Sequence, residues 1–235
     1  MRSAARSRMA PRRARSARTL KPAHARPRAA STMRATMDGI PLKQFIDLLS
    51  RGIATPRPVV RRMIDARPGP VDRVMLVGLA AALQGALWAA VGVLAPGMFQ
   101  GAFSGGLGFS GHLALAGLVF VNYAITTAAA IFFGGKFGGR GASGDVATAV
   151  AWHSVLAAAL TPLQAIGFGS AGPEGALGPG SALFVLLFLA LNIWLLASCV
   201  AEAHGFASTG RVAAAVIGLF FVFGFAVSLL IAATQ

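Results

Sequence analysis

Five long apolar runs constrain this chain more than any other feature, because each is close to the length that crosses a bilayer. A helical span needs about twenty mostly apolar residues, since hydrocarbon cannot hydrogen-bond backbone amides and a helix rises about 1.5 Å per residue. Links rich in Gly or containing Pro separate the runs. The sequence therefore predicts an all-α fold, a polytopic membrane bundle over residues 74–233 with five transmembrane helices at 74–94, 112–133, 146–166, 182–203 and 211–233.

The composition also indicates lipid as the solvent. Of the 235 residues, 56% are hydrophobic and only 12% are charged, a balance unlike that of a water-soluble globule. The third run is the least regular of the five, because Thr161-Pro162 interrupts it and Trp152-His153 lies in its first half. We expect a distorted helix there.

Basic residues are concentrated before the apolar body. Lys and Arg number 21 against 7 Asp and Glu, and all of them except Lys136, Arg140 and Arg211 lie at or before Arg73. No aromatic residues alternate with them in the leader, so the pattern indicates a membrane topology signal and not a nucleic-acid surface.

The loops between the runs predict an orientation. The first and third loops carry no Lys or Arg, whereas the second carries Lys136 and Arg140 and the fourth carries Arg211. Short cytoplasmic loops keep Lys and Arg. The sequence predicts a cytoplasmic N-terminus and a C-terminus on the opposite face.

Residues 1–36 form a separate basic leader. They are rich in Arg, Ala, Ser and Pro and contain no acid, so they have nothing to bury and repel one another. We expect this leader to be disordered. It is either a transit-like presequence or an upstream extension from a misassigned start, and the second is favoured because Met33 and Met37 can each begin the protein.

Residues 41–66 are predicted to be a cytoplasmic amphipathic segment. Thr55-Pro56-Arg57-Pro58 divides it into two pieces too short to span. Such a segment favours a helix in the headgroup region of an anionic leaflet, and packing under a partner or under the protein's own bundle is the alternative. Its apolar positions recur at helical spacing: Leu42, Phe45, Ile46, Leu49 and Ile53, then Val59, Val60, Met63 and Ile64.

The first span carries a stripe of small residues. Gly78, Gly85 and Gly92 repeat every seven residues, and small residues let membrane helices approach closely. The stripe predicts packing against a neighbouring helix or a second copy. The alternative is ordinary abundance, because the chain holds 29 glycines.

One amide falls on each of the first four spans. Polar groups inside a membrane are costly and are therefore candidates for function. The amides either converge on a polar path, as in a transporter or channel component, or pair between helices to pack the bundle. They are Gln84, Asn122, Gln164 and Asn192.

The remaining polar motifs predict no catalytic residue, cofactor or metal. Glu202 and His204 stand two apart, so their side chains diverge on a helix. His153 indicates a hydrogen-bonded structural residue, since a proton relay needs carboxylates at mid-span. Asp145 is expected to cap the third span.

Two further features argue against specific chemistries. The glycine-rich run 134–141 lacks the Gly-Lys-Ser/Thr ending of a phosphate loop. Cys199 is the only cysteine and lies in an apolar run, so no disulfide forms within the chain and the thiol is expected to pack as a small hydrophobe. We expect a protein that is not an enzyme.

Three motifs between the runs carry a family resemblance. They are Thr-Pro-Arg-Pro-Val-Val-Arg-Arg at 55–62, Gly-Gly-Lys-Phe-Gly-Gly-Arg-Gly-Ala-Ser-Gly-Asp at 134–145 with Ala151-Trp152 following, and Ala-Glu-Ala-His-Gly-Phe-Ala-Ser at 201–208. In this order they resemble bacterial members of the Yip family, the Ypt/Rab-interacting membrane proteins with a Yip-one domain. The resemblance covers residues 41–233.

The resemblance implies a multi-pass protein of the bacterial inner membrane with five spans and a cytoplasmic N-terminal region. Eukaryotic relatives associate with prenylated small GTPases, but this chain has little soluble N-terminal domain to hold one, so that partner is not transferred. The resemblance and the residues together predict a non-catalytic protein that organises membrane lipids or protein partners, with a small transporter or channel component as the alternative.

Overall fold

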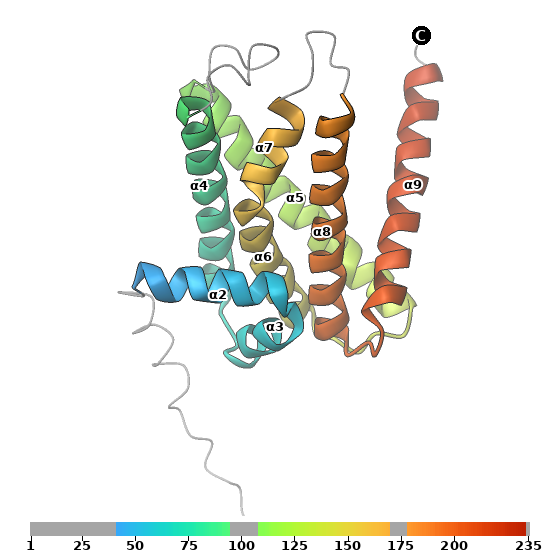
Figure 1. Cartoon of the computed structure of the whole chain (residues 1–235). Helices are drawn as coiled ribbons and strands as arrows, with labels where there is room; N and C mark the ends of the chain where they lie inside the picture. The colour runs from blue at the N-terminus through green and yellow to red at the C-terminus, as the bar shows by residue number, and fades with distance from the viewer. Residues whose placement is uncertain (1–40, 95–107, 170–177, 234–235) are drawn as a thin grey trace, which may run out of the picture.

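The computed structural model describes residues 41–94, 108–169 and 178–233. The predicted leader, with Met33 and Met37, lies outside them. Within the described ranges all regular structure is helical, which confirms the all-α prediction (Figure 1). The helices are α2 (Leu42–Ala54), α3 (Pro56–Asp65), α4 (Pro70–Leu94), α5 (Phe109–Lys136), α6 (Ser143–Ala159), α7 (Thr161–Gly169), α8 (Pro179–His204) and α9 (Thr209–Ala233).

Three of these helices, α4, α5 and α8, are long and apolar enough to cross a membrane, and the bent pair α6–α7 makes a fourth if it is counted as one span. These helices indicate a membrane-embedded helical bundle. The fifth predicted span is not confirmed. Helix α9 has 25 residues, but its described apolar stretch, Thr209–Val222, is shorter than a span, so a crossing there stays a prediction.

The interruption predicted at Thr161-Pro162 is confirmed. Helices α6 and α7 meet there at an angle of 51°. Pro162 has no backbone N–H to continue the ladder, and the N–H groups of Leu163 and Gln164 both donate to the Leu160 carbonyl, at 3.0 and 3.2 Å. The bend directs α7 against α8, where Gly167 lies so close to Val185 that a Cβ would stand 2.8 Å from its Cγ2.

The core lies where α6 packs between α4 and α8 (Figure 1). Trp152 and Leu156 of α6 belong to one core cluster with Leu195 and Cys199 of α8, and all four are fully buried. Cys199 thus packs as the small hydrophobe that the sequence predicted. Apolar residues on the other helix faces stay exposed in the isolated chain, as expected of surfaces that contact lipid.

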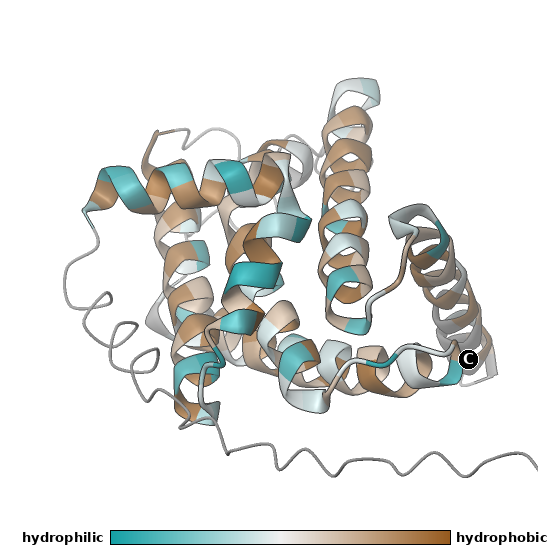
Figure 2. Cartoon of the chain, turned by 90° about the horizontal axis from the view of Figure 1, so that it is seen from below, coloured by the Kyte–Doolittle hydropathy of each residue, from teal (hydrophilic) through white to brown (hydrophobic). Residues whose placement is uncertain are grey.

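The two short helices, α2 and α3, form a platform at one end of the bundle. In Figure 1 α2 runs across the bundle and α3 lies beneath it, and Figure 2, which views this end from below, shows hydrophilic and hydrophobic residues mixed on both. The predicted break falls at Thr55, but the prolines belong to the second helix, because Pro56 occupies its first turn, where a missing N–H costs nothing. The second piece therefore begins at Pro56 and not at Val59.

The platform packs on the protein's own bundle with part of its apolar surface. Gly52 approaches α6 so closely that a Cβ would stand 2.7 Å from Leu156 Cδ2 and 3.4 Å from Trp152. Leu42 and Ile46 remain 73% and 53% exposed. The self-packing alternative is thus correct for one face of α2, and a second apolar surface is left over.

Candidate functional site

Two arginines of α3 converge on one carboxylate of α8. Arg57 Nε donates to Glu202 Oε2 at 2.9 Å, and Arg61 Nε donates to Glu202 Oε1 at 2.7 Å. The Glu202 side chain is 12% exposed, against 35% for Arg57 and 51% for Arg61. Short, charge-assisted bonds of this kind fix the direction of both partners, so they attach the platform to the end of α8.

Arg57 also binds the backbone that follows α8. Its Nη2 donates to the Phe206 carbonyl at 3.0 Å and its Nη1 to the Ala207 carbonyl at 3.3 Å. These carbonyls are presented by a turn in which Gly205 adopts φ +72°, the left-handed conformation that glycine tolerates at a helix end. Arg57 thereby links α3, the end of α8 and the connection to α9.

His204, the last residue of α8, packs against the last turns of α5 and the glycine-rich loop that follows it. Its Nε2 lies 3.0 Å from the Ala130 carbonyl, and its own carbonyl accepts the Arg140 N–H at 3.2 Å. A Cβ at Gly134 would overlap the imidazole ring, and one at Gly139 would stand 2.5 Å from Nδ1. Glycine is required at these two positions because the ring occupies the space of a side chain.

These contacts join the three segments that carried the family resemblance. Segment 55–62 provides Arg57 and Arg61, segment 134–145 provides the glycines, and segment 201–208 provides Glu202 and His204. We call this set the motif cluster: Arg57, Arg61, Gly134, Gly139, Glu202 and His204. Residues as far apart in sequence as Arg57 and Glu202, separated by 145 positions, thus form one structural unit at the platform end of the bundle.

The motif cluster explains two motifs that suggested chemistry. Glu202 and His204 diverge to different partners, Glu202 to the arginines and His204 to Ala130, and no group of three or more His, Cys, Asp or Glu in the described ranges could hold a metal ion. The glycine-rich run receives an imidazole ring.

His153 and Asn192 meet inside the bundle. The histidine is buried on α6 and interacts with Asn192 on α8, while its Nε2 makes no hydrogen bond to any described residue. The described carboxylates belong to α2, α3 and the terminal turns of α4, α6 and α8, so none of them stands at mid-span beside His153. This geometry suits the structural role predicted for the histidine.

The expected capping role of Asp145 is wrong in detail. Asp145 does lie in the first turn of α6, where a carboxylate favours the positive end of the helix dipole. The residue preceding the helix is Ala142, however, and no side chain makes a capping hydrogen bond there. Asp145 can act only through its charge.

The stripe of Gly78, Gly85 and Gly92 does not pack tightly within the chain. A Cβ at Gly78 or Gly92 would meet no atom within 4 Å, and one at Gly85 would make only an ordinary contact with His112 at 3.6 Å. Helix α4 instead buries Leu76, Val77, Ala80 and Ala81. Close packing of the stripe inside the bundle is therefore wrong, and its use by a second copy stays a prediction.

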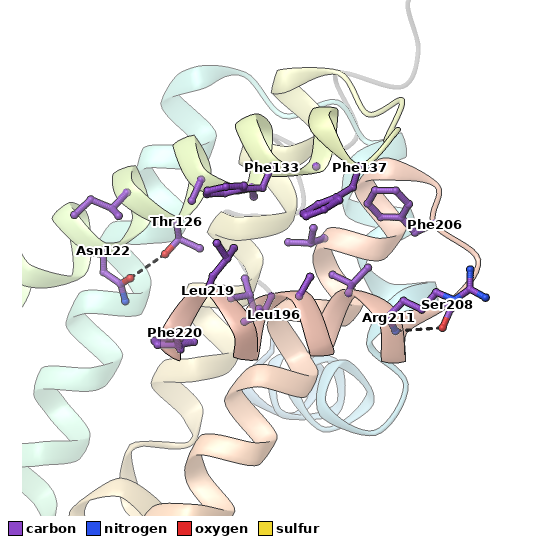
Figure 3. A pocket seen from close by; sticks show the side chains of 18 of the residues that line it. Asn122, Thr126, Phe133, Phe137, Leu196, Phe206, Ser208, Arg211, Leu219 and Phe220 are labelled. Carbon is purple, nitrogen blue, oxygen red and sulfur yellow. Dashed lines mark hydrogen bonds between the residues drawn. The ribbon is translucent and has the colours of Figure 1, made fainter. Parts of the chain in front are cut away.

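A cavity of about 870 Å³ lies between α5, α8 and α9. Figure 3 shows apolar side chains from α5 and α9 facing one another across it, with Arg211 and Ser208 at one end and Asn122 and Thr126 toward the other. Thr126 Oγ1 donates to Asn122 Oδ1 at 2.9 Å. Of the four predicted amides only Asn122 lines this cavity, so the amides do not converge here.

Sequence reasoning missed both the close contacts of the glycine-rich run and this cavity. The glycines were visible, but nothing local indicated that a histidine 65–70 residues later would occupy the space above them. The apolar residues of α5 and α9 that line the cavity recur at helical spacing, and the same spacing is expected of a surface that contacts lipid.

Comparison with known proteins identifies no relative: no family model, curated protein or solved structure matches the chain. Function has to be inferred from the geometry.

Proposed function

We propose that this protein is a non-catalytic, Yip-like membrane protein that organises anionic lipids, and through them protein partners, around its platform end. One observation carries the proposal. Every described Lys and Arg belongs to the platform, to the α3–α4 connection, to the first turns of α4 or α9, or to the end of α5 and the loop after it. These segments share one end of the molecule (Figure 1).

The platform is built to meet a membrane surface. It carries exposed Lys43 and Arg51 beside exposed Leu42 and Ile46 on α2. Each juxtamembrane basic residue near an anionic leaflet contributes about 1 kcal/mol of attraction, and the apolar side chains add burial at the headgroup boundary. The motif cluster holds this surface in a fixed position against the bundle.

Lipid composition around the protein tests the proposal. Native membranes would be extracted with a polymer that retains surrounding lipid, and the lipids counted by mass spectrometry. We expect anionic lipid to be enriched over the bulk membrane, and less so in the combined variant Lys43→Gln, Arg51→Gln, Arg62→Gln. Asp47→Asn, on the same helix, is the matched control and should not reduce the enrichment. Bulk composition around the wild-type protein would reject the proposal.

We further propose that the platform end faces the cytoplasm, because basic segments beside spans are retained there. Ser50 is exposed on α2 and the buried Cys199 is the only natural thiol. A Ser50→Cys variant should therefore resist an impermeant maleimide in intact cells and react in inverted vesicles. The reverse result would place this end outside.

Transport is the less supported candidate, because Asn122 alone of the four amides lines the cavity. A polar pathway predicts that Gln84→Leu, Asn122→Leu, Gln164→Leu and Asn192→Leu each alter flux in liposomes. Amides that only pack would alter stability and leave flux at background.

A further inference from the structure

We infer that the cavity between α5, α8 and α9 binds one anionic phospholipid, with its phosphate at Arg211 and an acyl chain between the two helices. This site is separate from the platform. It rests on the proposed function only in that both place the platform end at a membrane surface.

The walls of the cavity suit hydrocarbon. Helix α9 contributes Val212, Ala215, Val216 and Leu219, which recur at the spacing of one helix face. Phe133 of α5 lies opposite (Figure 3). The volume of about 870 Å³ falls in the range of about 300–1,000 Å³ that is typical of ligand pockets.

The cavity is open along its side. Ile125, Phe137 and Phe220 line it and yet are 64%, 65% and 59% exposed. Helix α9 packs on α8, and in Figure 1 it stands apart from the rest of the bundle. A lipid can therefore enter from the bilayer without passing through the core.

The mouth of the cavity carries a positive charge without a partner. Arg211 is exposed, is the charged residue among those that line the cavity, and makes no ion pair with any described carboxylate. Glu202, a nearby acid in sequence, is already shared by Arg57 and Arg61. Ser208 also lines this end of the cavity, and its hydroxyl accepts the backbone N–H of Arg211 at 3.3 Å.

The depth of the cavity matches one leaflet. From Arg211 to Phe220 a helix rises about 13 Å, close to half of a hydrocarbon core about 30 Å thick. The polar pair at the deep end is already joined, since Thr126 donates to Asn122. The cavity thus has a cationic mouth and an apolar interior, which is complementary to an amphiphile with an anionic head.

A transmembrane helix fits the cavity less well than a lipid. It would fill the apolar walls but bring no anion to Arg211. A phospholipid satisfies both parts at once.

Native mass spectrometry of the full chain tests the inference. Protein purified in mild detergent and delipidated would be titrated with phosphatidylglycerol and, separately, with phosphatidylcholine. We expect one phosphatidylglycerol per chain to bind preferentially, and Arg211→Gln to weaken it by about tenfold or more, since a charge-assisted contact is lost. Arg211→Lys keeps the charge and should retain most of the affinity. Arg140→Gln is the matched control, being exposed at the same end but outside the cavity, and should bind as wild type.

Filling the cavity with larger side chains provides a second, independent measurement. Ala215→Phe on α9 and Ala129→Leu on α5 should each abolish the tight lipid while elution volume and helical circular dichroism stay unchanged. Equal binding of the two lipids, unchanged binding by Arg211→Gln, or full binding by both correctly folded wall variants would overturn the inference. Displacement by inorganic phosphate would overturn it too, because the site would then recognise a free anion.

The proposed function of the platform and the lipid site in the cavity can be rejected independently of each other. The platform variant should lose general anionic enrichment but keep the single tight lipid, whereas Arg211→Gln should do the reverse. A dimer that dissociates on Ala215→Phe, with no lipid retained, would assign the cavity to a second copy and overturn the lipid site.

Discussion

The two halves of the bundle use similar apolar sequences in opposite ways. In the packed half, which consists of α4, α6 and α8, helix α6 buries most of its residues and packs between the other two helices. In the open half, which consists of α5 and α9, no residue in the most apolar stretch of α5 is buried. The described part of α9 contributes no residue to the core. Trp152 is 1% exposed, whereas Phe221 is 75% exposed.

This difference shows that hydrophobicity alone does not build the membrane core. In lipid an apolar side chain gains little by moving from acyl chains to protein, so close packing and polar contacts decide which helices associate. In the packed half α6 buries Ala149, Ala151 and Trp152 and makes the His153–Asn192 contact. In the open half a cavity lies between the helices.

The largest expected effect on stability comes from comparing Trp152→Ala in the packed half with Phe221→Ala in the open half. Removing the buried indole should lower the free energy of unfolding by about 3–5 kcal/mol, through lost contacts and a cavity. Removing the exposed ring should change it by less than about 0.5 kcal/mol. Denaturant titration in detergent micelles measures both, and similar losses would show that the open half is packed by contacts absent from the isolated chain.

The next test addresses the motif cluster, which connects the two halves. Arg57→Ala removes bonds to Glu202 and to two carbonyls and should cost about 1.5–3 kcal/mol. Arg61→Ala removes one contact of a half-exposed side chain and should cost about 0.2–1 kcal/mol. A double-mutant cycle with Glu202→Ala should show coupling to both; additive effects would mean that the ion pairs contribute nothing.

A somewhat smaller effect is expected where the α5 end receives His204. Gly134→Ala places a Cβ on the imidazole, and overpacking of this kind costs about 1–3 kcal/mol. Gly135→Ala is the matched control, because nothing lies within 4 Å of its Cβ, and it should stabilise the helix by up to about 1 kcal/mol. The double variant with His204→Ala should recover part of the loss. Equal effects at the two glycines would contradict the insertion of the ring.

The smallest effects are expected on the stripe of α4. Gly78→Ala and Gly92→Ala meet open space within the chain and should leave stability unchanged or raise it by about 0.5–1 kcal/mol. Unfolding at several protein concentrations checks this. A loss that appears only at high concentration would show that a second copy packs on the stripe.

The sequence was most informative about features that depend on local pattern. Run length and hydropathy predicted α4, α5 and α8 and the interrupted α6–α7 pair, because a helix in lipid has to satisfy its own backbone hydrogen bonds. Helical spacing predicted the amphipathic platform, and the loop charges predicted the end that is basic. The capping role of Asp145 failed because no side chain supplies the hydrogen bond that a cap requires.

Tertiary structure decided which residues meet. Arg57 and Glu202 are 145 positions apart, and nothing near either one specifies the other. For the same reason the sequence could not show that His204 packs against Gly134. Nor could it show that the regular stripe of Gly78, Gly85 and Gly92 is not closely packed within the chain. A helix sequence fixes its faces, since side-chain direction follows a period of 3.6 residues; which face meets protein, lipid or a bound ligand depends on how the other helices pack around it.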